Sequence, residues 1–222
     1  SILKTTYRDN RFLTADDRAA LENERDPYFY QVYTLGEWGA LGDTIFTNWR
    51  VENISPDAPG ETRMGLDFGF AQDPCGFVRL RYDRKRRKIY VLEELYQKGL
   101  TNLSLAERLR PYPGPIACDS AEPKSISELR LLGVRAYPVR KGPDSVLHGV
   151  QWLRQQEIIV SPACPRLREE LTLYQWRQDA QGNALPQPQD KNNHLIDAMR
   201  YALEEDMDSR RASTASRAAL GL

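Results

Sequence analysis

The stretch MGLDFGFAQDPCGFVRLRYDRKRRKIYVLEEL, residues 64–95, decides the fold. It contains three mainly apolar segments, at 64–68, 77–82 and 89–95, separated by one Gly/Pro turn and one charged turn. The aromatic and branched residues of these segments and the turns that bound them predict β-strands. Strands joined by such short turns must be antiparallel neighbours, because parallel strands need a long crossover connection. The stretch therefore predicts three adjacent antiparallel strands.

Helices and short strands alternate in the rest of the chain. Thr101 is typical of a helix N-cap, Gly133 of a helix stop and Pro165 of a first helical residue. These signals, with the spacing of apolar residues, predict helices at 102–109, 125–132, 145–155, 165–174 and 193–206, strands at 116–119, 135–139 and 158–160, and a hairpin at 175–189. This order predicts an α/β protein with a mixed sheet, three antiparallel strands followed by parallel ones, flanked by helices on both faces. That is the ribonuclease H-like topology.

Composition sets wide limits on the function. The 222 residues include 41% hydrophobic residues, enough to bury a core, and 31 basic residues balance 31 acidic ones. Zero net charge argues weakly against nucleic-acid binding, although the local distribution of charge matters more than the sum. Three cysteines without C-x-x-C spacing are expected to be reduced core residues. No stretch approaches 18 apolar residues, so no membrane-spanning helix is predicted. No secretion signal is recognised either.

The chain divides into three predicted parts. Residues 1–60 are expected to form an interdomain segment with short helices at 14–24 and 27–35. It ends in the turn-rich stretch Ile54–Ser55–Pro56–Asp57–Ala58–Pro59–Gly60. Residues 61–207 are expected to form the α/β domain, and the Ser/Ala/Arg-rich residues 208–222 a flexible tail. The start at Ser1 suggests a piece of a longer protein.

Three aspartates occupy positions that core packing does not explain. Asp67 lies inside the first predicted strand, Asp119 ends the fourth, and Asp197 lies beside the apolar face of the last helix. Burial of an unpaired carboxylate costs on the order of several kcal/mol. A bound metal ion would offset this cost, so metal binding would explain aspartates at such positions. Mg²⁺ prefers a few carboxylates together with water and phosphate oxygens. The three aspartates therefore predict a site for divalent cations.

Each aspartate also has a structural interpretation. Asp119 could cap the following helix, Asp67 could be a turn residue, and Asp197 could lie on a solvated helix edge. The functional interpretation rests on the three occurring together, on the first strand, the fourth strand and the last helix.

Three motifs resemble those of one protein family. Gly65–Leu66–Asp67–Phe68–Gly69–Phe70–Ala71–Gln72–Asp73–Pro74 resembles the opening of the nuclease domain of tailed-phage terminase large subunits. Asp119–Ser120–Ala121–Glu122–Pro123–Lys124–Ser125 resembles the second acidic motif of that family, and Asn193–His194–Leu195–Ile196–Asp197–Ala198–Met199–Arg200–Tyr201 the third. The resemblance covers roughly residues 62–205. Upstream, Gly36–Glu37–Trp38–Gly39 resembles the segment that joins the ATPase domain of the family to its nuclease.

The resemblance implies an endonuclease that cuts concatemeric viral double-stranded DNA while the genome is packaged. It implies two divalent cations, Mg²⁺ or Mn²⁺, and two-metal-ion phosphodiester hydrolysis. The expected partners are DNA bound largely without sequence preference, the terminase small subunit, the capsid portal and the ATPase domain of a full-length chain, all in the cytoplasm of the bacterial host. No Gly-x-x-x-x-Gly-Lys-Ser/Thr string occurs, so ATP hydrolysis is not expected in these residues.

The resemblance also suggests roles for single residues. Asp67 is the candidate to bridge two metals, with Asp119 and Asp197 each completing one site. Asp73 is either a further metal ligand or a brace for the turn before Pro74. His194 lies three residues before Asp197 on one helix face, where it would assist the metal, contact the phosphate or carry a proton, unless it only makes a hydrogen bond at the helix start.

Basic side chains supply the candidate DNA contacts. Lys124, Arg140, Lys141 and Lys191 are expected to contact the phosphate backbone. The basic run 84–88 is either solvated surface or a grip on DNA or a partner, and the sequence does not decide between these interpretations.

Two other functions fit the same sequence. A junction resolvase or a transposase-like enzyme would share the fold, but no segment dedicated to structure-selective DNA binding is recognised. A non-catalytic module that docks DNA or the portal would retain three mutually repelling carboxylates without benefit. The sequence thus favours the nuclease.

Overall fold

The computed structural model describes residues 12, 14, 44–55, 57–69, 73–140, 142, 144–179, 181 and 184–207. The chain forms two compact units, Ser1–Thr44 and Ile45–Leu222, and the fold described below is that of the second unit. Apart from Thr14, the helices expected at 14–24 and 27–35 lie outside the described residues, as does the tail expected at 208–222.

A seven-stranded mixed sheet forms the centre of this unit, with the strand order β1-β7-β4-β3-β2-β5-β6. Its strands are β1 (Trp49–Val51), β2 (Glu61–Asp67), β3 (Cys75–Asp83), β4 (Lys88–Gln97), β5 (Ile116–Cys118), β6 (Ala136–Pro138) and β7 (Glu157–Val160). Within this described sheet β3 runs antiparallel to β2 and β4, and the other neighbours pair in parallel. The predicted order of three antiparallel strands followed by parallel ones is confirmed.

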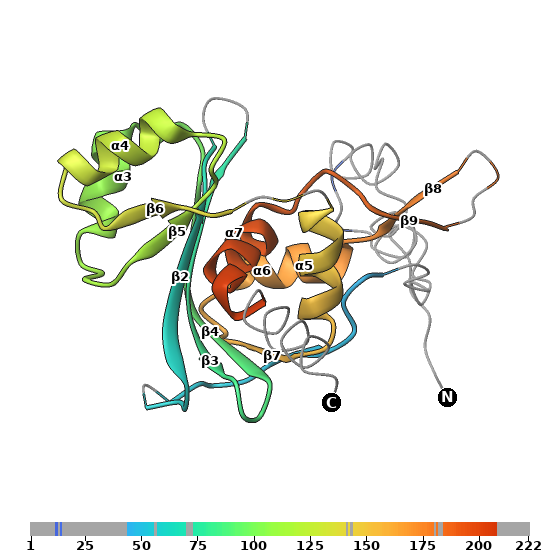
Figure 1. The fold of residues 1–222 in the computed structure, drawn as a ribbon. Coiled ribbons are helices and arrows are strands. Elements are labelled where there is room, and N and C mark those ends of the chain that lie inside the picture. The colour runs from blue at the N-terminus through green and yellow to red at the C-terminus, as the bar shows by residue number, and fades with distance from the viewer. Residues whose placement is uncertain are drawn as a thin grey trace, which may run out of the picture. The chain divides into compact units, whose positions relative to one another are not determined.

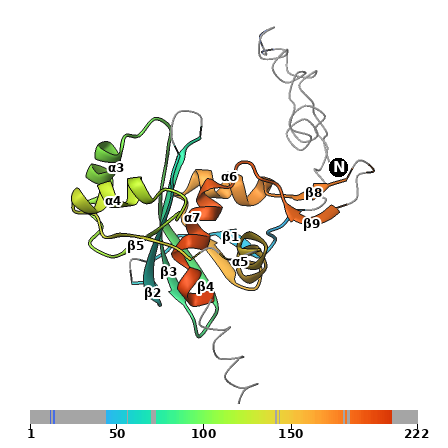
Figure 2. The ribbon, with the colours of Figure 1, turned by 45° about the horizontal axis from the view of Figure 1, so that its top comes forward.

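Helices cover both faces of the sheet (Figure 1). They are α3 (Asn102–Leu109), α4 (Pro123–Leu131), α5 (Ser145–Leu153), α6 (Pro165–Leu173) and α7 (His194–Ala202). Helices α3 and α4 lie on one face, and α5, α6 and α7 lie on the other, as the second view also shows (Figure 2). A separate two-stranded hairpin, β8 (Trp176–Gln178) and β9 (Ala184–Pro188), precedes α7 in the chain.

Alternation along the strands divides the core into two hydrophobic layers. Met64 and Leu66 of β2 pack with α3 and α4, whereas Val78 and Leu80 of β3 pack with α5, α6 and α7. Successive side chains of a strand point to opposite faces, so one sheet supplies both layers. The three cysteines are free and buried, as the sequence predicted, within these layers.

Strand β1 is not predicted from the sequence. The compact unit begins at Ile45, and both Ile45 and Phe46 are buried in its core, so residues 45–60 of the expected interdomain segment lie within this unit. Strand β1 has three residues and pairs in parallel with β7 through Trp49 and Ile158. A segment this short carries too little periodicity to be recognised without its partner strand.

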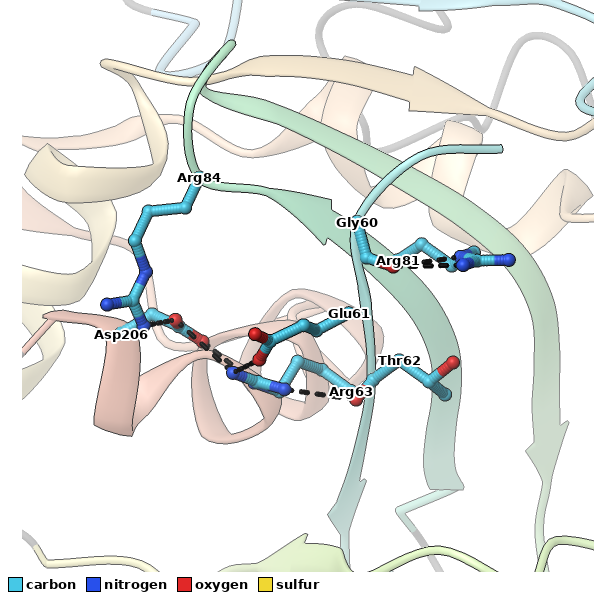
Figure 3. A network of polar contacts seen from close by, with 7 residues as sticks. All are labelled: Gly60, Glu61, Thr62, Arg63, Arg81, Arg84 and Asp206. Carbon is cyan, nitrogen blue, oxygen red and sulfur yellow. Dashed lines mark hydrogen bonds and ion pairs between the residues drawn. The ribbon is translucent and has the colours of Figure 1, made fainter. Parts of the chain in front are cut away.

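The basic run at 84–88 forms the turn between β3 and β4 together with the first residue of β4, and most of its side chains have polar partners. Arg84 and Arg63 both bind the carboxylate of Asp206, whose side chain is 1% exposed (Figure 3). Arg86 pairs with Asp83, Arg87 donates to Gln155, and Lys88 pairs with Glu157. Three of the five basic residues, Arg84, Arg87 and Lys88, therefore bind residues elsewhere in the fold, and Arg86 pairs locally, although the side chains at 84–87 are exposed.

None of the described helices combines the length and apolar composition that crossing a membrane requires.

Candidate metal centre

The carboxyl ends of two adjacent strands place Asp67 and Asp119. Strands β2 and β5 pair in parallel, with Leu66 opposite Cys118, and the backbone N–H of Asp119 donates to the carbonyl of Leu66 at 3.1 Å. Asp67 therefore follows Leu66, and Asp119 follows Cys118, at the same end of the sheet. Since Leu66 and Cys118 both point into the layer of α3 and α4, the next residue on each strand points to the opposite face, toward α7.

Helix α7 lies directly on β2 and β3 because two glycines leave space for it. A Cβ atom on Gly65 would lie 1.9 Å from the carbonyl oxygen of Ala198, and one on Gly76 would lie 2.8 Å from the carbonyl carbon of His194. Any larger residue at these positions would force the helix away from the sheet. The close approach brings His194 and Asp197, on the first turn of α7, toward the strand that carries Asp67.

Asp67 and His194 form a direct pair. His194 Nδ1 lies 3.0 Å from Asp67 Oδ2, and Asp67 is only 9% exposed. Burial raises the pKa of Asp67 to about 6, the hydrogen bond from His194 opposes this, and the negative charges of Asp197 and Asp119 add to the rise. The hydrogen bond to Asp67 raises the pKa of His194. The influence of Asp197 and Asp119 on Asp67 indicates that all three predicted aspartates share one electrostatic environment.

Asp197 has two neighbours on its own helix end. The Nε atom of Arg200 donates to Asp197 Oδ1 at 2.9 Å, and Asn193 Nδ2 donates to Asp197 Oδ2 at 3.1 Å. Arg200 is 6% exposed, so its guanidinium is an interior charge. Asp197 therefore does not lie on a solvated edge with a free carboxylate. Sequence reasoning missed Asn193 and Arg200, although their offsets of −4 and +3 from Asp197 could have indicated them.

Asp119 binds the loop that follows its strand. Its Oδ1 atom accepts a hydrogen bond from the backbone N–H of Ala121 at 2.8 Å, and the hydroxyl of Tyr201 donates to Oδ2 at 3.3 Å. The N-cap of α4 is Glu122, not Asp119. The structural interpretation of Asp119 as a helix cap is therefore wrong in detail, although the residue does brace the turn before the helix.

The donor set suits a hard divalent cation, although the side chains are paired with protein groups. Among the described residues, no three or more His, Cys, Asp and Glu side chains are grouped closely enough to hold a metal ion. Each aspartate instead has a nitrogen or hydroxyl donor from the protein. Carboxylate oxygens at one end of a sheet are the donors that Mg²⁺ or Mn²⁺ takes. Burial first, and then the neighbouring negative charges, raise the pKa of Asp67, and a cation would offset both effects.

A cavity of about 670 Å³ opens beside the end of β2. Its lining includes Gly69, Asp73, Glu122 and Glu128, so it is an acidic cavity. Asp73 is exposed there, and its charge contributes to the raised pKa of His194. The link between Asp73 and the site is therefore electrostatic.

The predicted DNA contacts come from different elements of the fold. Lys124 is exposed on the first turn of α4, and Lys191 is exposed in the loop before α7. Arg140 is exposed after β6, and its backbone N–H donates to Glu204 at 3.0 Å. Lys141 lies outside the described residues.

Glu170 of α6 is a further acidic residue near the site that sequence reasoning missed. It is 3% exposed, and its Oε2 atom accepts hydrogen bonds from the backbone N–H groups of Leu195 and Ile196, at 2.9 and 3.0 Å. Burial raises the pKa of Glu170 to about 7, against the effect of these two hydrogen bonds. A glutamate on an amphipathic helix resembles any surface residue, so the sequence carries no signal for this role.

Comparison with known proteins identifies relatives along most of the chain. Residues 67–205 match the model of the terminase RNAseH like domain. The large terminase subunit of Bacillus phage SPP1 is 36% identical over 217 residues, covering 91% of this chain and 51% of that protein. The PBSX phage terminase large subunit of Bacillus subtilis (strain 168) is 29% identical over 214 residues, covering 90% of this chain and 49% of that protein. The chain thus spans about half the length of these curated relatives.

Solved structures agree with this result. The crystal structure of the large terminase nuclease domain from bacteriophage SPP1, with bound Mn, superposes with a TM-score of 0.67 at 36% identity, covering 72% of this chain and 98% of that one. The large terminase of a thermophilic bacteriophage shares the fold at 21% identity, with a TM-score of 0.58 and coverage of 90% of this chain and 54% of that one. The predicted ribonuclease H-like fold is confirmed, and the chain belongs to the family of terminase RNase H-like nuclease domains.

Proposed function

We propose that this chain is a metal-dependent endonuclease that cuts concatemeric viral double-stranded DNA during genome packaging. The observation that carries the proposal is the position of Asp67 and Asp119, which end adjacent parallel strands below the helix that bears His194 and Asp197. The relative from phage SPP1, whose nuclease domain was solved with bound Mn, supports the use of a divalent cation.

The aspartates would hold the metal, with Asp67 shared between two ions and Asp119 and Asp197 completing one site each. Divalent cations so held supply Lewis acidity at the phosphodiester and lower the pKa of a water molecule. The protein's own part is to keep Asp67 fixed through its hydrogen bond with His194. Asp73, exposed on the adjoining cavity, is proposed as an additional outer ligand.

His194 is proposed to carry a proton during cleavage. Its Nδ1 atom faces Asp67, which fixes the ring, so Nε2 is the atom that would exchange a proton with water or the leaving oxygen. The hydrogen bond with Asp67 raises the pKa of His194, which favours the protonated ring that a general acid needs.

DNA would be held through its phosphates. Lys124, Arg140, Lys141 and Lys191 are proposed to contact the backbone without reading the base sequence, so binding would weaken as the salt concentration rises. The ATPase domain of a longer chain, the terminase small subunit and the capsid portal are proposed partners, with the host bacterial cytoplasm as the place of action.

Incubation of supercoiled plasmid with the purified chain and Mg²⁺ or Mn²⁺ tests the proposal. Nicked and linear products are expected with the wild type and with Asp57→Ala, a control that removes an exposed carboxylate from the loop before β2. Asp67→Ala and addition of EDTA should both remove the activity, by more than ~100-fold for a group that holds a catalytic metal. Equal cleavage by wild type and Asp67→Ala would refute the proposed site. An intact plasmid with both metals would indicate that the chain is either a docking module or a nuclease that needs its ATPase partner to cut.

A further inference from the structure

The first turn of α7 receives its N-terminal cap from another helix. The first N–H groups of any helix have no partner within that helix and need acceptors from elsewhere. Asn193, at the N-cap, makes no side-chain cap, because its amide nitrogen donates to Asp197 instead. Leu195 and Ile196 are fully buried, so water does not serve their N–H groups. An acceptor must therefore come from the protein.

Glu170 of α6 is that acceptor. Its Oε2 atom takes both N–H groups, at 2.9 and 3.0 Å, and its Oε1 atom is buried with no hydrogen-bond partner among the described residues. Both hydrogen bonds that the carboxylate of Glu170 accepts thus come from α7. The two amides that it binds belong to Leu195 and Ile196, which lie between His194 and Asp197 in the chain.

Helix α6 is itself capped in the same way. Glu94 of β4 accepts hydrogen bonds from the backbone N–H groups of Arg166 and Leu167, at 2.9 and 2.8 Å, and the N-cap residue Cys164 makes no side-chain cap. Glu94 therefore fixes α6 to the sheet, and Glu170 fixes α7 to α6. The same chemistry acts at two helix starts, but the first turn of α6, which Glu94 binds, carries no candidate site residue, whereas the first turn of α7 carries His194 and Asp197.

The first turn of α7 consequently has little freedom to move. Glu170 holds its buried amides on one side, while the backbone of Gly76 lies close against His194 on another. This is the turn from which His194 reaches Asp67 at 3.0 Å. A displacement of about 1 Å at a reacting group can lower a rate ~100-fold, so the cap is placed where a small shift would matter.

We propose that Glu170 is a positioning residue of the nuclease site, which holds the start of α7 so that His194 meets Asp67 and Asp197 faces the aspartates of the sheet. The predicted effect of Glu170 on cleavage rests on the proposed function, whereas its predicted effect on the position of the His194 ring does not.

Substitution at both caps separates positioning from stability. Glu170→Met removes the acceptor and keeps a side chain of similar length, Glu170→Gln keeps an amide oxygen as acceptor, and Glu94→Met removes the matching cap from α6. We expect Glu170→Met to lower kcat by ~10- to 100-fold with little change in KM for DNA, and Glu170→Gln to restore most of that loss. Glu94→Met should lower the melting temperature comparably and leave kcat much closer to the wild-type value.

A spectroscopic measurement on the metal-free chain makes the test independent of cleavage. The chain has two histidines, so long-range ¹H–¹⁵N spectra resolve the His194 ring, with His148 as an internal reference. Glu170→Met should move the Nδ1 signal of His194 and leave that of His148 in place. The inference is overturned if the His194 signal stays at its wild-type position, or if Glu94→Met moves it as far.

If Glu170→Met does not fold, Glu170→Asp, whose shorter side chain withdraws the carboxylate, is read in the same way. A wild-type chain that cuts no DNA would count against cleavage by this chain alone, while the ring signals still decide the role of Glu170.

Discussion

Asp67 Oδ2 and His194 Nδ1 lie 3.0 Å apart, although 127 residues separate them in the sequence. The pair joins the carboxyl end of β2 to the first residue of α7. It places the titratable ring of His194 against the buried carboxylate of Asp67. The charges of Asp197 and Asp119 act on that carboxylate as well.

Replacement of His194 should slow cleavage without unfolding the chain. We expect His194→Gln to lower kcat by about 10- to 100-fold, the range found when a group that orients a metal ligand is removed. The control is His148→Gln on α5, which should cut plasmid DNA near the wild-type rate. Steady-state cleavage at saturating Mn²⁺ measures both, and equal rates for the two variants would rule out a role for His194.

Metal affinity should depend on pH through Asp67. The folded-state pKa of Asp67 is raised to about 6, and a carboxyl must lose its proton to bind a metal. Mn²⁺ binding is therefore expected to be strongest above pH 7 and to weaken as the pH falls through about 6. Calorimetric titration with Mn²⁺ at several pH values tests this. An affinity that is constant between pH 5 and 8 would contradict it.

Glu170 should make the chain less stable as the pH rises. Its pKa in the folded state is raised to about 7 from the usual 4.5, so folding favours the protonated form. The associated stability is fully present below the unfolded-state pKa and is lost as the pH rises through about 7. Glu170→Gln cannot ionise, so its free energy of unfolding should fall less than that of the wild type between pH 5 and 8. Urea unfolding at both pH values measures this difference. If the free energy of unfolding changes equally with pH in both proteins, the raised pKa of Glu170 is refuted.

Gly65 should not tolerate a side chain. A Cβ atom at this position would lie 1.9 Å from the carbonyl oxygen of Ala198, so Gly65→Ala forces α7 away from β2. We expect a loss of about 1–3 kcal/mol in the free energy of unfolding, typical of overpacking, together with lower activity. Gly142→Ala is the control, because a Cβ atom there meets no atom of the described residues within 4 Å. Similar unfolding curves for both variants would show that the helix is not held so close to the strand.

Asp206 should stabilise the fold through the segment that directly follows α7. Its buried carboxylate binds Arg63 of β2 and Arg84 of the β3–β4 turn (Figure 3). We expect Asp206→Ala to lower the free energy of unfolding by about 1–3 kcal/mol, the range for hydrogen bonds to charged groups, since both arginines retain contact with solvent. Removal of Glu61, an exposed partner of Arg63, is the control and should cost about 0–1 kcal/mol. Thermal unfolding distinguishes the two, and an equally small loss for Asp206→Ala would mean that this network adds little.

Much of the fold was accessible from the sequence because its signals are local. Short turns between 64 and 95 required antiparallel strands, and the apolar spacing of 193–206 required a helix on which Asp197 lies. Element ends were less accurate: α4 begins at Pro123, two residues before the predicted start, because Pro is well suited to a first helical position. Strand β1 escaped prediction because its three residues gain order only by pairing with β7.

The sequence by itself determined the order of the elements and the identity of the three aspartates, since alternation in strands and spacing in helices are properties of neighbouring residues. Only the tertiary structure decided which groups meet. It paired His194 with Asp67, paired three of the five basic residues at 84–88 with distant residues, and buried Glu170 under the start of α7. These contacts join segments far apart in the chain, and their free energy depends on burial and distance, which no local pattern of residues encodes.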